Sequence, residues 1–512
     1  MTSGGPGPAT GTPGSDDDIS EDVPEQMRIR REKRMRLLER GINPYPPTVE
    51  RTHTLSQIRA AYDGMDLPPD SHTGEHVAIT GRVIFLRNTG KLCFVRLREG
   101  NRTELQVMLS QADLGEQSLT DFKAFVDIGD LLAVQGEVVT SRRGELSVQA
   151  SAWQLSAKTL RPLPVEHEPL SDEARVRMRY ADLIVRPEAR EMVQIRATVL
   201  KSLRESLDAR GYTEVETPTL QYVHGGAAAR PFITHLNAFD EDITLRIALE
   251  LYLKKCIVGG IERVYEIGRI FRNEGVDSTH SPEFTMLEAY AAYGDYDTQA
   301  ELTRALVLDA ARAIGRTVIP DGRGSGEIDL EGPWHHIPLL DAVSEVLGDE
   351  ITLDTPLEKL RGYANSRAVE VDPRWDGDQI IVELYEQLVE ASLLEPTFIR
   401  DYPASLKPLA RPHRSKPGLT EAWDLVIGGV ELVTAYSELA DPVIQRERLV
   451  AQSILAADGD PEAMRLDEDF LRALEYGFPP TGGMGMGIDR LIRLLMGVGI
   501  RETILFPMVR PE

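Results

Sequence analysis

The chain contains very little cysteine. Its 512 residues include two cysteines, Cys93 and Cys256, which lie far apart in apolar surroundings. Two isolated cysteines provide neither a disulfide framework nor a structural zinc site, and they suit a reducing compartment. The sequence also lacks the run of roughly 18 apolar residues that a membrane-spanning helix needs, and its beginning has no signal-peptide pattern. These absences predict a cytoplasmic protein without a membrane segment.

Positive charge is scarce, because 57 Lys and Arg stand against 82 Asp and Glu, for a net charge of −25. This balance argues against a nucleic-acid partner, but the charge is uneven. Residues 1–24 are rich in Gly, Pro and Ser and then acidic, which predicts a disordered tail. Residues 25–41 predict a helix that stops at Gly41. That helix presents a cluster of basic residues: Arg28, Arg30, Arg31, Lys33, Arg34, Arg36 and Arg40. The cluster is either a local phosphate-binding element or a solvated helix surface.

Short alternating runs broken by Gly, Asn and Asp fill residues 76–154. Five such runs predict an OB-type barrel. The segment 158–169 contains three prolines and predicts a semi-rigid linker. A long helix pattern over 191–209, ended by Gly211, opens the second half of the chain. We therefore expect a tail (1–24), a basic helix and extension (25–63), a barrel (64–157), a linker (158–190) and a large domain (191–512) with a helical insertion at about 301–392.

The stretch FRNEGVDSTHSPEFTMLEAY, Phe271–Tyr290, predicts a strand, a polar loop and a returning strand. Because side chains alternate along a strand, the returning strand places four residues on one face: Phe284, Met286, Glu288 and Tyr290. Arg272 and Glu274 share a face of the outgoing strand. An arginine can fork onto a phosphate, a phenylalanine can stack on a base, and a carboxylate can accept from an exocyclic amine. The alternative is an amphipathic hairpin with ordinary cross-strand ion pairs.

Asp424 and Glu431 flank a turn in DLVIGGVE, which predicts a hairpin that brings both carboxylates together. Paired carboxylates and triphosphate oxygens form a site for Mg²⁺, which prefers oxygen ligands shared with substrate phosphate. The alternative is a surface hairpin with two solvated acids.

Three segments resemble, in order, the three motifs of class II aminoacyl-tRNA synthetases. They are TEVETPTL (Thr213–Leu220), Phe271–Glu274 with the strand after it, and Gly485–Arg490 within GGMGMGIDRLIRLLMG. The GMGMG run also fits a dinucleotide-binding loop, but no preceding βαβ pattern supports that alternative. Further stretches resemble the lysine-specific members of the class: RMRYADLIVRPEAR, GGAAARPFITH, LRIALELYLKKCIVGGIERVYEIGRIFRNEG, ELVTAYSEL and IRETILFPMVRP.

The resemblance implies an α+β protein with an N-terminal OB-fold anticodon-binding barrel. Its catalytic domain would be an antiparallel β-sheet flanked by helices. The implied activity is ATP-dependent ligation of L-lysine to tRNA(Lys) through a lysyl-adenylate, with release of AMP and pyrophosphate. The implied assembly is a homodimer that uses Mg²⁺. Because the attacking lysine carboxylate is already an anion, the protein has to position groups and stabilise charge.

The resemblance also implies roles for individual residues. Arg272 would hold the α-phosphate and Arg490 the γ-phosphate. Phe284 would stack on adenine, Glu274 would read its amino group, and His280 would meet the leaving phosphates. Glu431 would serve both ATP and the metal, together with Asp424. The implied lysine pocket consists of Gly226, Glu250, Glu288, Tyr290, Thr434, Tyr436 and Glu438. The implied anticodon residues are Phe94, Gln106 and Glu145; alternatively, Phe94 belongs to the barrel core.

The sequence departs from the usual family wording in two places, IALEL (Ile247–Leu251) and VTAYSEL (Val433–Leu439). Leu249 stands where proline is usual, Thr434 replaces asparagine, and Tyr436 replaces phenylalanine. A threonine offers the lysine carboxylate one hydroxyl, whereas an asparagine offers an amide with two polar ends. Three other functions compete: lysylation of a protein, supply of lysyl-tRNA for lipid modification, and tRNA binding by an inactive paralogue.

Overall fold

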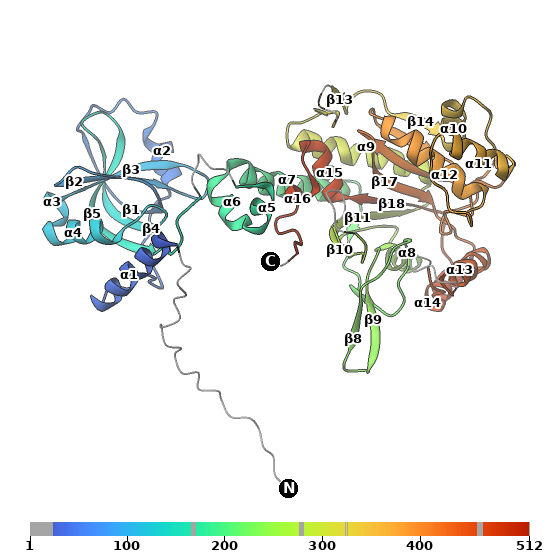
Figure 1. Cartoon of the computed structure of the whole chain (residues 1–512), viewed down its shortest axis with the longest axis horizontal. Helices are drawn as coiled ribbons and strands as arrows, with labels where there is room; N and C mark the ends of the chain where they lie inside the picture. Colours follow the sequence, from blue (N-terminus) through green and yellow to red (C-terminus); the bar gives the residue numbers. More distant parts are fainter. Residues whose placement is uncertain are drawn as a thin grey trace, which may run out of the picture. The chain divides into compact units, whose positions relative to one another are not determined.

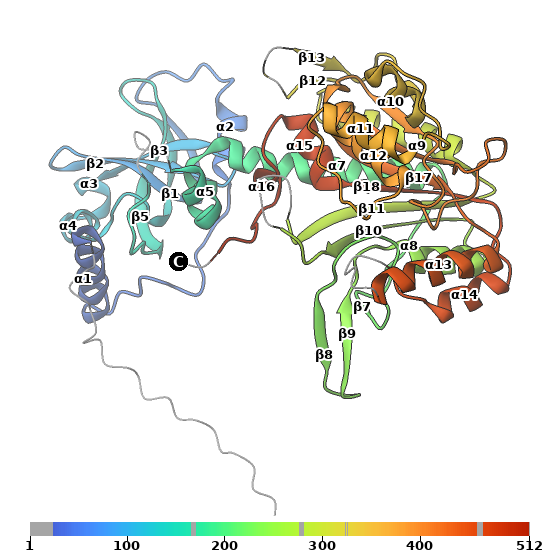
Figure 2. The ribbon, with the colours of Figure 1, turned by 45° about the vertical axis from the view of Figure 1, so that its right-hand side comes forward.

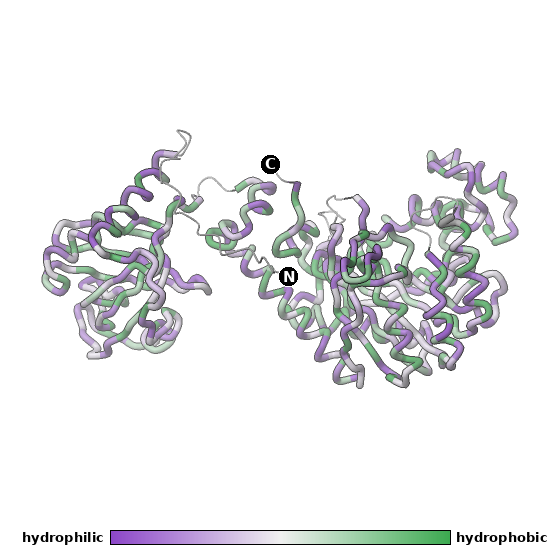
Figure 3. The backbone as a smooth tube through the Cα atoms, turned by 90° about the horizontal axis from the view of Figure 1, so that it is seen from below, coloured by the Kyte–Doolittle hydropathy of each residue, from purple (hydrophilic) through white to green (hydrophobic). Residues whose placement is uncertain are grey.

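The computed structural model describes residues 24–164, 170–275, 281–322, 324, 326–457 and 464–510. The chain divides into two compact units, residues 1–170 and 171–512 (Figure 1). Hydrophobic and hydrophilic residues alternate along the tube of both units, as expected where one face of an element is buried (Figure 3).

The first unit is a closed five-stranded barrel in the order β1-β2-β3-β5-β4, which confirms the predicted OB-type fold. Its strands are β1 (His72–Asn88), β2 (Leu92–Arg98), β3 (Glu104–Ser110), β4 (Leu131–Thr140) and β5 (Leu146–Ala157). In β2, Cys93, Val95 and Leu97 point into the barrel and are at most 1% exposed. Helices α3 (Gln111–Leu114) and α4 (Glu116–Phe125) lie between β3 and β4.

Helices α1 (Glu25–Glu39) and α2 (Leu55–Tyr62) pack against this barrel through Leu37, Leu55 and Ile58. The predicted stop at Gly41 is confirmed, since its φ of 71° is left-handed. Part of the basic cluster on α1 holds the helix in place. Arg30 donates to the Ile128 carbonyl at 2.8 Å, and Lys33 pairs with Asp127 at 2.6 Å. These two side chains are therefore committed to the fold and are not spare phosphate ligands.

The segment expected to be a linker, 158–190, is mostly built into the two units. Lys158 has a fully buried side chain that pairs with Asp127 and with Asp130, at 2.5 and 2.7 Å, within the first unit. Residues from Asp172 onward form α5 (Asp172–Arg177), α6 (Arg179–Val185) and the start of α7 (Pro187–Ala209). Arg179 donates to the carbonyls of Leu505 and Arg501, which ties α6 to the second unit. The prolines led to the prediction of a longer linker. Proline spacing carries no information about the contacts that Lys158 and Arg179 make, so these contacts could not be predicted.

The second unit is built on an eight-stranded sheet in the order β14-β15-β16-β17-β18-β11-β10-β6. Its pairs are antiparallel except β14–β15 and β10–β6. The strands are β6 (Thr213–Glu214), β10 (Arg263–Phe271), β11 (Glu283–Ala292), β14 (His335–Pro338), β15 (Thr397–Arg400), β16 (Ala422–Ile427), β17 (Val430–Ser437) and β18 (Thr481–Gly487). The predicted antiparallel sheet flanked by helices is thus confirmed in its central part.

One face of this sheet packs on α7, α9 (Tyr296–Ala313) and α15 (Ile488–Met496), which share the largest core cluster. The opposite face packs on α8 (Glu250–Val258) and α14 (Glu468–Glu475). The remaining elements are α10 (Leu339–Leu347), α11 (Leu357–Ser366), α12 (Gly377–Leu388), η1 (Glu390–Ser392), α13 (Pro442–Ala457), α16 (Ile500–Thr503), β12 (Val318–Pro320) and β13 (Glu327–Asp329).

The helical insertion expected at 301–392 is integrated with the domain. It begins inside α9, a core helix, and it contributes β14, the edge strand of the main sheet. A separate three-stranded sheet, β7 (Leu220–Gln221), β9 (Glu241–Leu245) and β8 (Ile233–Leu236), carries a hairpin that projects from the unit (Figure 2). Among the described residues, no helix is long and apolar enough to cross a membrane.

Candidate active site

The β10–β11 hairpin carries the first part of the site. Its register pairs Ile270 with Phe284, Glu266 with Glu288, and Val264 with Tyr290. The alternate residues Leu287 and Ala289 pack into the core under α9. The predicted shared face of Phe284, Met286, Glu288 and Tyr290 therefore lies on the other side of the sheet.

Arg272 and Glu274 follow β10, which ends at Phe271, so they lie in the connection and not in the strand as expected. The Arg272 amide still donates to the Pro282 carbonyl at 2.9 Å, which fixes its position beside β11. The Arg272 guanidinium lies 5.3 Å from the Phe284 ring centre. Burial lowers the pKa of Arg272 from its ordinary value. A half-buried cation over an aromatic ring can receive an anion and a flat base together. His280 lies outside the described residues.

The predicted carboxylate hairpin is formed by β16 and β17. Gly428 and Gly429, with φ of 63° and 72°, make its turn, and both conformations favour glycine. A register shift in the middle of the hairpin places Val426 opposite Glu431, while Asp424 lies opposite Thr434. Burial and the nearby Asp424 both raise the pKa of Glu431. The Arg490 guanidinium donates to the Glu431 backbone carbonyl at 3.0 Å and lies 3.4 Å from the Glu431 carboxylate, so the pair and this arginine form one charged group.

Lys407 enters this charged group, and nothing in its sequence context signalled it. Its ammonium lies 3.1 Å from Asp424 and over the rings of Tyr402 and Tyr436, at 4.5 and 5.7 Å. Burial would lower the pKa of Lys407, but Asp424 outweighs burial and raises it. One predicted metal ligand therefore already faces a cation in the protein alone.

Strand β18 explains the glycine-rich run GGMGMG. It is a central strand that pairs with β11 and β17, which excludes a dinucleotide-binding loop. A Cβ on Gly483 would lie 2.1 Å from Glu438 Oε1 and 2.4 Å from the Tyr290 ring. A Cβ on Gly485 would lie 3.6 Å from Glu288 Cγ. The missing side chain of Gly483 therefore makes the space that Glu438 and Tyr290 occupy, whereas a Cβ on Gly485 would be in ordinary contact with Glu288.

Three buried carboxylates converge beside this strand: Glu250, Glu288 and Glu438. They are 5%, 4% and 1% exposed and come from α8, β11 and the end of β17. Burial raises the pKa of Glu288 to about 7. Glu438 Oε1 is buried and accepts no hydrogen bond from any described residue. Clustered buried acids are costly unless cations join them. Lys254 supplies one cation, 2.6 Å from Glu250 and 2.5 Å from Glu438, and the three carboxylates leave negative charge for a second.

Gly226 borders the same group of acids. Its φ of 88° is left-handed, and a Cβ there would lie 3.0 Å from Ala248 and 3.1 Å from Glu250 Cβ. Glycine is therefore required for this close approach of backbone to the acidic pocket.

Leu249, which stands where proline is usual, contributes its backbone. Its N–H donates to Glu288 Oε1 at 2.9 Å, while the Tyr290 hydroxyl donates to Glu288 Oε2 at 3.0 Å. A proline has no N–H to give. The departure thus adds a hydrogen bond to one of the pocket acids, and the Leu249 side chain fills the core.

Thr434 and Tyr436 lie on the site face of β17. The Thr434 hydroxyl is buried and has no hydrogen-bond partner among the described residues. Burial raises the pKa of Tyr436 to about 12. The free threonine hydroxyl leaves one donor available to a ligand in this part of the pocket.

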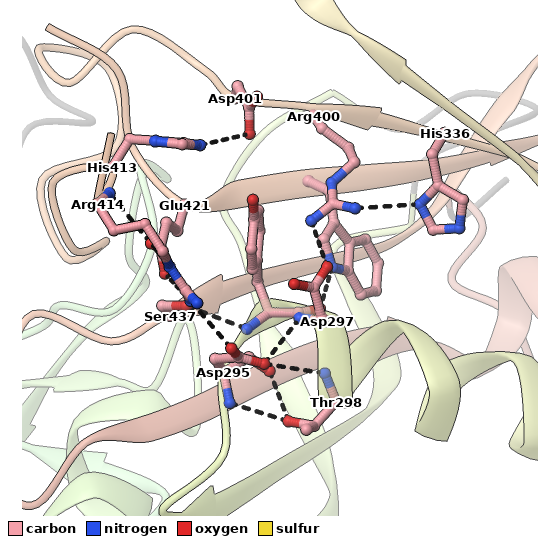
Figure 4. Close-up of polar contacts among 12 residues, drawn as sticks. Asp295, Asp297, Thr298, His336, Arg400, Asp401, His413, Arg414, Glu421 and Ser437 are labelled. Carbon is pink, nitrogen blue, oxygen red and sulfur yellow. Dashed lines mark hydrogen bonds and ion pairs between the residues drawn. The ribbon is translucent and has the colours of Figure 1, made fainter. Parts of the chain in front are cut away.

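A second polar network, on the face covered by α9, fixes the chain around Ser437 (Figure 4). Arg414 pairs with Glu421 and with Asp295, the latter at 2.9 Å. The Tyr296 amide donates to the Ser437 hydroxyl at 3.1 Å. Because neighbouring residues of an extended chain point to opposite sides, anchoring Ser437 on one face also fixes the direction of Glu438 on the other.

In the barrel, Phe94 is half-buried on the outer face of β2, between the inward residues Cys93 and Val95. The alternative that Phe94 belongs to the barrel core is therefore excluded. Gln106 on β3 donates to the Ser147 hydroxyl at 2.9 Å, and Glu145 accepts from Arg59 at 3.3 Å. Since β3 pairs with β5 at Gln106 and Ser147, the half-buried Gln106 lies beside the fully buried Ser147, and the exposed Glu145 side chain lies just before β5.

Phe85 and Arg96 extend this outer face and were not predicted. They are paired positions of β1 and β2, with the guanidinium 6.0 Å from the ring, and Phe85 is 48% exposed. The outward alternation of Phe85 and Arg87 in VIFLR could have signalled them. An exposed aromatic ring with arginines beside it is a typical surface for stacking unpaired bases.

Comparison with known proteins assigns each of the two units to a protein family. Residues 171–510 match the family described as tRNA synthetases class II (D, K and N), and residues 77–156 match the OB-fold nucleic acid binding domain. The chain belongs to the class II tRNA synthetases. Within this family, Arg272, Glu288 and Arg490 lie in the segments that resembled its second and third motifs.

Similar synthetases come from actinobacteria. The chain is 56% identical to a lysine–tRNA ligase of Mycolicibacterium gilvum over 96% of its length and 98% of that protein. It is 56% identical to a lysine–tRNA ligase of Kineococcus radiotolerans, over 97% of its length and 99% of that protein. It is also 49% identical to the lysylphosphatidylglycerol biosynthesis bifunctional protein LysX of Mycobacterium ulcerans, but covers 44% of that longer protein.

Proposed function

We propose that this class II synthetase ligates L-lysine to tRNA(Lys), using ATP, through a lysyl-adenylate, with release of AMP and pyrophosphate. The observation that carries the proposal is the convergence of Glu250, Glu288 and Glu438 on one buried pocket. The ammonium of a lysine side chain must lose its water to enter such a pocket, and several carboxylates repay that cost. The relatives named lysine–tRNA ligase support the same amino acid.

The reaction requires the protein to hold two anions together, the lysine carboxylate and the triphosphate of ATP. Arg272, over Phe284, would hold the α-phosphate while Phe284 stacks on adenine and Glu274 accepts from its amino group. Arg490 would hold the γ-phosphate from its place beside Glu431, and His280 would meet the departing phosphates. The lysine carboxylate would then lie against the α-phosphorus, where the Arg272 charge would stabilise the negative charge of the transition state.

The lysine pocket combines acids, hydroxyls and one glycine. Glu250, Glu288 and Glu438 would receive the ammonium groups, Tyr290 would hold Glu288, and the backbone at Gly226 would close the amino-acid end. The free Thr434 hydroxyl would donate to the substrate carboxylate, with Tyr436 beside it.

Magnesium fits the pair Asp424 and Glu431. Asp424 is buried and Glu431 is partly exposed, and the pKa of Glu431 is raised by loss of hydration and by the nearby Asp424. Among the described residues there is no cluster of three or more His, Cys, Asp or Glu that could hold an ion, so phosphate oxygens would complete the coordination. Bound magnesium supplies neutralising charge to the triphosphate. Lys407 would share Asp424 with the ion or turn away from it.

The barrel would recognise the anticodon. Phe94 would stack on a base, and Gln106 and Glu145 would hydrogen-bond the central uridine. Their common outer surface, with Phe85 and Arg96 beside them, supports this assignment. The exposed remainder of the basic cluster on α1 would contact tRNA phosphates.

A homodimer and a cytoplasmic location complete the proposal. Exposed apolar side chains gather between the first motif and the β8–β9 hairpin: Leu220, Tyr222, Ile233 and Phe239 are all more than half exposed. Such patches mark contact surfaces, and a second copy of this chain is the proposed occupant. We place the domains at residues 25–164 and 171–510.

The deciding experiment is ATP–pyrophosphate exchange by the purified protein, with each amino acid in turn and without tRNA. Lysine-dependent, magnesium-dependent exchange is expected, followed by charging of tRNA(Lys). Exchange driven by aspartate or asparagine would refute the lysine assignment. Exchange without charging of tRNA would favour a protein-lysylating enzyme, and binding of tRNA without exchange would identify an inactive paralogue.

A further inference from the structure

The ammonium of Lys254 is buried between two of the three pocket carboxylates. It lies 2.6 Å from Glu250 Oε1 and 2.5 Å from Glu438 Oε2, and its side chain is 1% exposed. Lys254 comes from the second turn of α8, four residues after Glu250. The proposed substrate pocket therefore contains a lysine cation that belongs to the protein.

Lys254 pairs with one oxygen of Glu250 and one oxygen of Glu438, and the second oxygen of each carboxylate does not contact it. Glu438 Oε1 accepts no hydrogen bond from any described residue, and it faces the bare backbone of Gly483. Glu250 Oε2 lies 3.8 Å from the position that a Cβ on Gly226 would take. Both remaining oxygens thus lie against glycine backbone, and Glu438 Oε1 is left without a donor among the described residues.

The charge of Lys254 is secure in this setting. Burial alone would lower its pKa, but Glu250 and Glu438 outweigh burial and raise it. Both carboxylates consequently have a permanent counter-cation, and their side chains are held in one orientation before any substrate binds.

We propose that Lys254 determines the amino-acid selectivity of the pocket by occupying one oxygen of Glu250 and one of Glu438. A compact ammonium can bind single oxygens from two carboxylates. A planar guanidinium binds best to both oxygens of one carboxylate, and neither carboxylate has both oxygens available. Lys254 is a positioning residue that favours lysine over arginine, and this inference rests on the proposed lysine pocket.

The test compares three variants in ATP–pyrophosphate exchange with lysine and with arginine. Lys254→Met removes the cation and frees both oxygens. Lys254→Arg keeps the cation but brings a fork that takes more carboxylate oxygens. Lys255→Met is the matched control, since Lys255 is the next residue of α8 and pairs with Asp469, whose side chain is 73% exposed.

Lys254→Met should raise the KM for lysine at least about tenfold, leave the KM for ATP within about twofold, and lower the lysine-to-arginine ratio of kcat/KM by roughly ten- to a hundredfold. Lys254→Arg should also raise the KM for lysine, because the oxygens meant for the substrate are taken. Lys255→Met should change none of these values. Thermal unfolding of each variant reports whether it folds.

An unchanged lysine-to-arginine ratio in Lys254→Met overturns the inference, even if the KM for lysine rises. If Lys254→Met does not fold, Lys254→Arg decides: wild-type KM and selectivity would mean that only a buried counter-charge is needed. The wild-type protein shows which proposal has failed. If the wild type has no lysine-dependent exchange, the proposed function is refuted. If the wild type and Lys254→Met both prefer lysine over arginine to the same extent, only the role of Lys254 is refuted.

Discussion

Glu288→Gln changes one charge in the pocket and almost no volume. In the wild type, both Glu288 oxygens accept hydrogen bonds, from the Leu249 amide and the Tyr290 hydroxyl. Glutamine keeps one acceptor oxygen, and Tyr290 can rotate its hydroxyl to accept from the new amide. The fold should therefore be preserved, and the change isolates the contribution of the Glu288 charge.

The size of the effect follows from what the charge does in each state. A hydrogen bond to a charged group contributes about 1.5–3 kcal/mol, so losing it should raise the KM for lysine roughly ten- to 150-fold. Without lysine, the Glu288 charge destabilises the folded protein instead of stabilising a complex. Burial raises the pKa of Glu288 from 4.5 to about 7, so the wild-type fold loses stability as the pH rises through this interval. Above pH 7 the empty variant should be the more stable protein, by at most about 3 kcal/mol.

Two assays check this pair of opposite effects. Pyrophosphate exchange at saturating ATP gives the KM for lysine at pH 6, 7 and 8.5, and thermal unfolding without ligand gives stability at the same pH values. The wild-type KM should fall as Glu288 ionises through about pH 7, and the variant should lack this step. A variant KM within twofold of wild type at pH 8.5 would show that Glu288 does not bind the lysine ammonium.

Other substitutions test the remaining parts of the site. Arg272→Ala should lower the exchange rate by roughly two to three orders of magnitude, and a near-normal rate would mean that other groups hold the α-phosphate. Phe94→Ala should impair tRNA charging by about 1–3 kcal/mol and leave pyrophosphate exchange unchanged; equal damage to both assays would contradict a role confined to the anticodon. Leu249→Pro should weaken lysine binding by about 1 kcal/mol through the lost amide donor, and unchanged binding would make that bond incidental. Thr434→Asn should tighten lysine by at most about 1 kcal/mol with little change for ATP, and loss of activity would mean that the pocket is rebuilt around threonine.

The sequence predicted the elements whose signals are local. Alternation predicted the barrel strands and the shared face of β11, and Gly41 and Gly211 predicted helix ends that the structure confirms with left-handed φ values of 71° and 78°. The linker was predicted too long, because Lys158 and Arg179 are anchored by partners distant in sequence.

The site was predictable as a set of motif residues but not as a charge arrangement. Lys254 and Lys407 look like ordinary helix and loop lysines, and only the folded chain places them against Glu438 and Asp424. The backbone N–H of Leu249 could not be foreseen as a Glu288 donor, since a substitution for proline gives no hint of where the new N–H points. Contacts between elements far apart in the chain are decided by packing, which the sequence pattern does not encode locally.

Strand β18 has a consequence for inhibitor resistance. Resistance commonly arises when a side chain in contact with a drug is exchanged for a larger or smaller one. At Gly483 there is no side chain to shrink, and any enlargement collides with Glu438 and Tyr290, on which substrate binding is proposed to depend. Substitution of Gly483 therefore gives no route to resistance that would spare the protein's own substrate binding.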